Sequence, residues 1–181
     1  MVDFPSTYTD FAVNWFDSFK SVVVNTEDFI STLLDDGYFR APASTMYHGC
    51  HEGGLWEHSV ATTKHLLDIT ENMHLAWSRP ESPYIVGLFH DLCKADNYCG
   101  TKDIWEYNKS TLFKGHGVKS VLMLSSLIKL TEEEVACIVY HMGAFSENKE
   151  DWRDYTRAVS KYPNVLWTHT ADMLAAHVDK T

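Results

Sequence analysis

The sequence has few cysteines and no long apolar run. Its four cysteines, Cys50, Cys93, Cys99 and Cys137, are scattered, and none of them forms the CxxC spacing of a structural zinc knuckle. We therefore expect reduced thiols in a cytoplasmic protein rather than a disulfide framework. No apolar run approaches the length of a membrane span, and the first residues lack the charged and apolar regions of a signal peptide. We expect no membrane partner.

Basic residues are also scarce. The chain of 181 residues has 15 Lys and Arg against 25 Asp and Glu, which gives a formal net charge of −10. Long duplex nucleic acid as the main partner would require a basic face that neutralises many phosphates, so the composition argues against it. A small phosphorylated substrate remains compatible with this charge, because a metal ion supplies positive charge locally.

Internal repeats, low-complexity segments and alternating strand patterns are absent too. Hydrophobic residues make up 45% of the chain and aromatic residues 13%, which is ordinary for a globular protein and excludes disorder. The length suits one domain with a sizeable core. We predict an all-α bundle of about seven or eight helices over residues 1–181, with residues 1–40 as a helical extension packed on it.

Hydrophobic periodicity and capping residues place the helices. The predicted ranges are 8–24, 25–37, 55–72, 84–94, 116–128, 131–141 and 163–178, with a polar helix or turn at 150–161. Residues 95–114 are expected to be irregular, with short extended structure around 105–107. The aromatic residues of the first helix favour core packing over a base-stacking surface, and Glu132, Glu133 and Glu134 are expected to form an acidic first turn.

The central motif is His90-Asp91, which ends the apolar run of residues 84–89 and is followed by Lys94. Burying an adjacent imidazole and carboxylate is costly unless each finds a partner. A divalent metal ion is the partner that accepts both at once. The motif therefore predicts a metal site.

Other candidate ligands lie on separate predicted helices. They are His58, His116, His141 and Asp172, and imidazole with carboxylate is the donor set of a divalent transition metal. Four of the six candidates lie within about one turn of a predicted helix boundary. For any single histidine, a satisfied core residue is an equally good interpretation, so spacing alone does not decide.

The motifs around these residues are more specific. They are Gly53-Gly54-Leu55-Trp56-Glu57-His58-Ser59, Phe89-His90-Asp91-Leu92-Cys93-Lys94, Gly115-His116-Gly117, Tyr140-His141 and Thr170-Ala171-Asp172. This order, H…HD…H…H…D, resembles the signature of the HD-domain metal-dependent phosphohydrolases. The resemblance spans residues 47–180.

The resemblance implies an all-α HD fold and a set of metal ligands. His58, His90, Asp91 and Asp172 are expected to bind one ion, while His116 and His141 help to hold a second, with Asp91 bridging. One or two ions of Fe, Mn, Co, Ni or Zn suit these donors. The chain is most similar to the exoribonuclease-type HD module.

The chain departs from that branch in two places. The nucleic-acid-binding domain that accompanies such exonucleases is missing, and Met142 follows His141 where many relatives carry a second histidine. We therefore expect a small nucleotide or a short oligonucleotide as substrate.

Several further residues are candidates for contact with a phosphate. Lys94 lies one helical turn after Asp91 and is predicted to neutralise substrate charge, although an exposed solubilising lysine is the alternative. His48 and His51 flank Gly49 in the loop before the glycine pair and are predicted to bind phosphate or donate a proton to the leaving group, with His48 preferred. Ordinary polar loop residues are an equally good interpretation of both. Gly54, at a helix start, and Lys114, before the Gly115-His116 pair, complete the predicted substrate-binding set.

Two functions remain open at this level. The leading hypothesis is a metal-dependent phosphohydrolase that cleaves a phosphoester or phosphoanhydride bond of a nucleotide-like substrate, with water activated by the metal. The alternative is a non-catalytic metal-containing module that binds or senses a nucleotide. His169, three residues before Asp172, has a possible role behind the ligands, with core or surface placement as the favoured interpretation.

Overall fold

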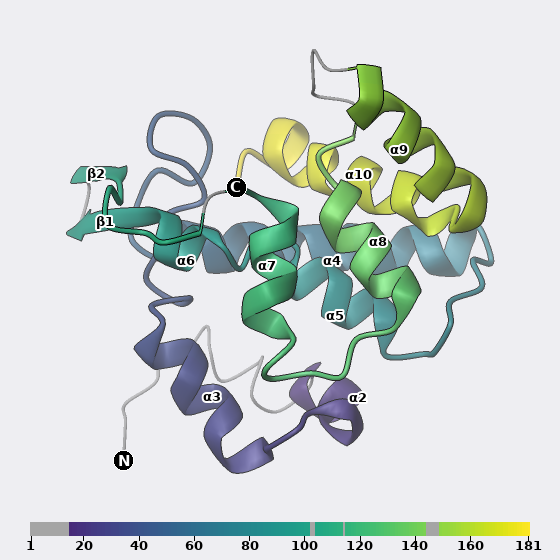
Figure 1. Cartoon of the computed structure of the whole chain (residues 1–181), viewed down its shortest axis with the longest axis horizontal. Coiled ribbons are helices and arrows are strands. Elements are labelled where there is room, and N and C mark those ends of the chain that lie inside the picture. The colour runs from purple at the N-terminus through teal and green to yellow at the C-terminus, as the bar shows by residue number, and fades with distance from the viewer. Residues whose placement is uncertain (1–14, 102–103, 114, 144–148) are drawn as a thin grey trace.

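The computed structural model describes residues 15–101, 104–113, 115–143 and 149–181 and shows a helical molecule with one small hairpin (Figure 1). The prediction of an all-α fold is confirmed. Within the described residues, no helix combines the length and the apolar character needed to span a bilayer. The four cysteines are free thiols.

The helices follow the predicted order along the chain. They are α2 (Phe16–Phe19), α3 (Thr26–Asp35), α4 (Gly54–Asn72), α5 (Ser82–Phe89), α6 (Lys94–Asn97), α7 (Gly117–Leu124), α8 (Glu132–Tyr140), α9 (Lys149–Lys161) and α10 (Asn164–Leu174). A 3-10 turn, η2 (Lys20–Val22), follows α2, and a π-helical segment, η3 (Ala175–Asp179), follows α10.

Helices α4 and α5 pack closely and form the centre of the molecule, with α8 and α10 against them (Figure 1). Gly87 of α5 makes this approach possible, because a Cβ atom there would lie 2.5 Å from Oγ1 of Thr63 on α4. The loop that precedes α4 is equally tight. A Cβ on Gly54 would lie 2.0 Å from the carbonyl oxygen of Gly49, so these glycines let two helices and a loop meet at backbone distance.

The N-terminal segment supports the end of α5. Phe19 and Phe29 pack edge-to-face on Phe89, with ring centroids 5.8 and 5.9 Å away, and the Tyr38 hydroxyl donates a hydrogen bond to the Leu88 carbonyl. These aromatic residues are core residues, as the sequence favours. In its described part the predicted helix over 8–24 is helical only over α2, because α2 gives way to the η2 turn and Val23 is extended. Residues 1–14 lie outside the described part of the chain.

The predicted helix over residues 84–94 is divided at the His-Asp motif. Helix α5 ends at Phe89, and α6 begins only at Lys94. Between them the backbone tightens into turns in which Leu92 N bonds Phe89 O at 3.2 Å and Lys94 N bonds Asp91 O at 2.9 Å. Tighter i to i+3 bonding rotates successive side chains by more than an α-helix does, which sets the directions of His90 and Asp91.

Strands β1 (Tyr98–Thr101) and β2 (Ile104–Tyr107) pair antiparallel as a hairpin, with Tyr98 opposite Tyr107. The extended structure expected around 105–107 is present, but its partner strand was not predicted. Hairpin β1–β2 follows α6 directly and projects at one end of the molecule, away from α9 (Figure 1).

Helix α8 is capped as its sequence predicts, but its glutamates do more than form an acidic turn. Thr131 and Glu134 form a reciprocal capping box. Glu134 is fully buried and also accepts hydrogen bonds from Arg79 at 2.7 and 2.8 Å and from the Ser82 hydroxyl at 2.8 Å. Glu133 is buried too and accepts from the Asn164 amide at 2.8 Å. These two carboxylates therefore tie α8 to α5 and α10.

We expect Arg79→Met to lower the free energy of unfolding by roughly 3–5 kcal/mol, because it leaves the buried Glu134 carboxylate without its charged partner. Urea unfolding followed by circular dichroism measures this. Arg157→Met, which removes an exposed partner of Asp154, is the matched control and should leave the midpoint unchanged. Equal midpoints for the two variants would contradict the importance assigned to this pair.

Candidate metal centre

Six side chains from five parts of the chain converge on one buried point. His58 comes from α4, His90 and Asp91 from the turn after α5, His116 from the residue before α7, His141 from the end of α8, and Asp172 from α10. His58, His90 and His141 are fully buried, and Asp91 is nearly so. The structure therefore brings together all the residues that the sequence suggested as ligands, and their role as ligands remains a prediction.

Four of these side chains present atoms at the spacing of ligands around one ion. His58 Nε2 lies 3.1 Å from Asp172 Oδ1 and 3.3 Å from His90 Nε2, and Asp91 Oδ2 lies 3.7 Å from His58 Nε2 and 3.4 Å from His90 Nε2. Ligand atoms bonded to one ion at about 2.1 Å, with angles of roughly 90–109°, lie about 3.0–3.4 Å apart. The separations of 3.1 to 3.4 Å fit that geometry, whereas His58–Asp91 at 3.7 Å and His90–Asp172 at 3.8 Å are wider.

The other oxygen of Asp91 faces a second group of imidazoles. Asp91 Oδ1 lies 2.6 Å from Nε2 of His116 and 3.3 Å from Nε2 of His141. Asp91 Oδ1 and His116 Nε2 form a close ion pair, whereas the buried His141 Nε2 has no hydrogen-bond partner. One carboxylate thus points its two oxygens at two separate sets of nitrogen atoms.

The protonation of the imidazoles fits a cation at this point. His90 Nδ1 donates to the Gly87 carbonyl at 2.9 Å, and His141 Nδ1 donates to the Ile138 carbonyl at 2.7 Å. With Nδ1 protonated, a neutral ring carries its lone pair on Nε2, and Nε2 lies 3.4 Å from an Asp91 oxygen in His90 and 3.3 Å in His141. Burial lowers the pKa of His90 and favours the neutral ring. A lone pair facing a carboxylate is unfavourable without a cation between them, so this donor set fits a divalent ion.

Positive groups balance the charge of Asp91. Burial alone would raise the pKa of Asp91, but Lys94 and His116 outweigh it and hold the pKa well below its usual value. Lys94 Nζ lies 2.6 Å from Asp91 Oδ2. Burial likewise opposes the charged form of His116, yet Asp91 raises its pKa to about 10. Asp91 therefore remains a carboxylate under all ordinary conditions, as a ligand must.

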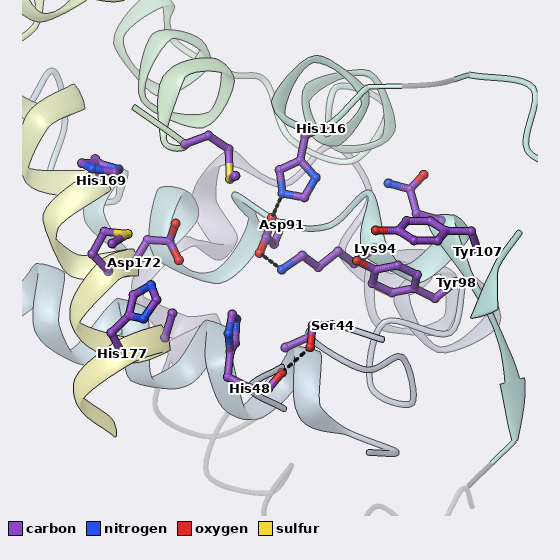
Figure 2. Close-up of a pocket in the computed structure, with 15 residues that line it drawn as sticks. Ser44, His48, Asp91, Lys94, Tyr98, Tyr107, His116, His169, Asp172 and His177 are labelled. Atoms are coloured by element: carbon purple, nitrogen blue, oxygen red, sulfur yellow. Dashed lines mark hydrogen bonds and ion pairs between the residues drawn. The ribbon is translucent and has the colours of Figure 1, made fainter. Parts of the chain in front are cut away.

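A cavity of about 380 Å³ opens onto this centre (Figure 2). It is lined by Ala43, Ser44, His48, Asp91, Lys94, Asn97, Tyr98, Tyr107, His116, Met142, His169, Asp172, Met173, Ala176 and His177. Figure 2 shows Lys94 reaching across the floor toward Asp91, with His48 and His177 on one side and the two tyrosines beyond the lysine. The volume is at the lower end of the range for small-molecule sites.

The predicted phosphate-binding residues are placed differently from one another. Lys94 and His48 line the cavity. The pKa of His48 is lowered to about 4, mainly by burial and also by the nearby His58 and Lys94. His51 is turned to Glu57 at 3.0 Å and does not line the cavity. Gly54 is buried against Gly49 and is not part of the lining. Lys114 lies outside the described residues.

Several lining residues were not predicted as part of the site. They include His169, Met173, Ala176 and His177, and Figure 2 shows His169 and His177 on the same side of the cavity as Asp172. Helical spacing from Asp172 places positions i−3, i+1, i+4 and i+5 on one face, so periodicity together with the assigned ligand would have found them. His177, which carries no motif, would have been recovered in this way.

His169 holds the turn that carries His141. Its Nδ1 donates to the carbonyl oxygen of His141 at 2.7 Å. The ring also lies directly against Gly143, where a Cβ atom would be 2.8 Å from the imidazole. Gly143 has a φ of +66°, which favours glycine. Helix α10 therefore supplies both Asp172 and the residue that fixes the position of His141.

We expect His169→Leu to weaken Mn²⁺ binding by roughly 10- to 100-fold, the usual effect of losing a partner behind the ligands. Competition with a fluorescent chelator measures the affinity. His169→Asn is the matched variant, because its amide nitrogen occupies the place of Nδ1 and can still donate to the His141 carbonyl. Unchanged affinity in the leucine variant would show that His169 only fills space.

Comparisons with known proteins agree with this geometry. The family described as HD domain matches residues 55–180, which covers every one of the six converging side chains. Searches of curated proteins and of solved structures return no significant match. The HD domain family consists in general of metal-dependent hydrolases, whose divalent ions are bound by histidine and aspartate. Since the match covers more than half of the sequence, the chain belongs to the HD domain family.

Proposed function

We propose that this protein hydrolyses a phosphoester or phosphoanhydride bond in a small nucleotide-like substrate. The observation that carries the proposal is the position of Asp91, whose two oxygens face two sets of imidazoles at the floor of an open cavity. When bound there, divalent ions supply positive charge that polarises a phosphoryl oxygen and lowers the pKa of water. Two ions with Asp91 between them correspond to the six-ligand, exoribonuclease-type branch.

The residues of this chain have distinct roles in the proposed reaction. Asp91 and Asp172 hold negative charge at the floor, and Lys94 places its ammonium group beside Asp91, where it neutralises charge on the phosphate. His48 lies opposite on the loop before α4, with its ring centroid 5.3 Å from that of His58. Because its pKa is lowered to about 4, His48 acts at pH 7 as a neutral N–H donor to the phosphate or the leaving oxygen.

The size of the cavity favours a small substrate. About 380 Å³ suits a ligand of the size of one nucleotide better than a dinucleotide or an oligonucleotide. The acidic net charge of −10 agrees with a small ligand rather than a polynucleotide. We therefore rank mononucleotides first among the substrates.

The test is a screen of the purified protein, supplemented in turn with Mn²⁺, Fe²⁺, Co²⁺, Ni²⁺ and Zn²⁺, against nucleoside mono-, di- and triphosphates, dinucleotides and short oligonucleotides. We expect phosphate release from at least one small nucleotide. Asp91→Asn removes the shared carboxylate and should reduce turnover to the background rate. Retention of metal without hydrolysis of any compound would instead favour the non-catalytic nucleotide-binding module.

Lys94→Met should lower kcat by roughly 100-fold, in line with the loss of one electrostatic donor at a transition state. The variant should keep its metal content, because Lys94 is not a ligand. Lys64→Met, at an exposed position of α4, is the control and should behave as wild type. Wild-type kcat in Lys94→Met would remove this residue from the reaction.

A further inference from the structure

We propose that Tyr98 and Tyr107 of hairpin β1–β2 form the specificity wall of the cavity and bind a planar aromatic ring of the substrate, such as a nucleobase. This inference rests on the proposed function, since it assumes that the phosphate of the same substrate lies at the metal centre. It assigns a role to a hairpin that the metal site itself does not use.

The hairpin is attached to the metal centre through a short, rigid connection. Asp91, α6 and β1 follow one another directly, so Tyr98 stands seven positions after Asp91. Tyr98 and Tyr107 are cross-strand partners at the base of the hairpin, and their rings pack edge-to-face with centroids 5.3 Å apart. In an edge-to-face pair one ring presents its edge, and Tyr107 is largely exposed, so aromatic surface is available there for a third ring.

A buried lysine fixes the base of the hairpin. Lys119 of α7 is only 3% exposed, and its ammonium group donates to Asn97 Oδ1 at 2.6 Å and to Thr111 Oγ1 at 2.5 Å. It also pairs with Asp96 Oδ2 at 2.5 Å. Asn108 closes the other side, donating from its backbone to Asn97 O at 2.8 Å and from its amide to Asp96 O at 2.9 Å.

This network explains why a charged side chain is buried beside the site. A buried lysine is costly unless it is fully paired, and here each of its contacts holds the segment on which Tyr98 and Tyr107 stand. The two tyrosines are therefore held in place before a ligand binds, and such preorganisation favours affinity. Fixed positions of the two rings beside the cavity are what stacking of a substrate ring requires.

The order of groups across the cavity matches the order of groups in a nucleotide. Along the cavity lining, Asp172 is followed by Asp91, then by the ammonium group and alkyl chain of Lys94, and then by the two tyrosines (Figure 2). Tyr107 lines the cavity although its side chain remains 66% exposed, so a large aromatic surface faces solvent there. A ligand with a phosphate at one end and a flat ring at the other would contact both ends of this wall.

The experiment uses compounds that bind but cannot be cleaved. The probes are the four nucleoside 5′-methylenephosphonates, in which carbon replaces the bridging oxygen, and ribose 5-methylenephosphonate, which has no base. Calorimetry with the Mn²⁺-loaded full-length protein gives each Kd. For wild type we expect at least one nucleoside compound to bind more tightly than the compound without a base.

Substitutions of Tyr107 distinguish the contribution of its ring to binding from that of its hydroxyl group. Tyr107→Leu should weaken binding of the nucleoside compound by roughly 5- to 150-fold, the range of base–aromatic stacking, and should leave the ribose compound unchanged. Tyr107→Phe keeps the ring and should bind as wild type does. Phe113→Leu, an exposed aromatic residue outside the cavity lining, is the control and should have no effect.

Three outcomes would overturn the inference. They are equal wild-type binding of the compounds with and without a base, wild-type affinity in Tyr107→Leu, and an equal loss in the phenylalanine and leucine variants. The last outcome would assign the contact to the hydroxyl group. Because the probes are not cleaved, these results stand apart from the proposed function, whose own failure would appear as absent turnover of the cleavable nucleotides.

Discussion

The structure depends on one buried carboxylate that must find positive charge. Asp91 is 2% exposed. Its two oxygens are surrounded by four imidazoles, those of His58, His90, His116 and His141, and by the ammonium group of Lys94. A buried, unpaired carboxylate would destabilise the fold strongly. Lys94 and His116 compensate it within the protein. His58, His90 and His141 place ring nitrogens 3.3 to 3.7 Å from the same oxygens, and a cation among them gives that arrangement a physical reason.

The rest of the fold can be understood as the support of this point. Tyr38, Phe19 and Phe29 pack against the end of α5. These contacts fix the position at which the turn with His90 and Asp91 begins. The buried carboxylates of Glu133 and Glu134 fix α8 against α5 and α10, and α8 carries His141. The positions of His90, Asp91 and His141 are thus set by contacts made elsewhere, as preorganised sites require.

The sequence predicted the centre better than its surroundings. The HD motif, the helices and the cap of α8 could be predicted because adjacent polar residues, apolar periodicity and Thr131 with Glu134 are local signals. The tight turn at 90–93 and strand β1 could not, since neither has a local signature and both depend on tertiary contacts. The same holds for the burial of Glu134, which is decided by Arg79, a residue 55 positions away.

The residues that line the cavity also divide into those that local motifs predict and those that depend on tertiary contacts. His48 and Lys94 were suggested by their place in the motifs, and both line the cavity. His169 was considered only as a residue behind the ligands and His177 was not singled out, because a histidine on a helix face gives no sign of its neighbours until another residue of that face is assigned. The paired tyrosines of the hairpin required the register of two strands, Tyr98 opposite Tyr107, which no sequence pattern in this segment specifies.

The central claim is that the converging histidines and aspartates hold divalent metal. The most direct measurement is the anomalous diffraction of a crystal grown with Mn²⁺, collected near the manganese absorption edge. The account predicts a strong peak within bonding distance of His58, His90, Asp91 and Asp172, and a second peak between Asp91, His116 and His141 where both ions bind. A crystal at full Mn²⁺ concentration with no peak among these six side chains would contradict it.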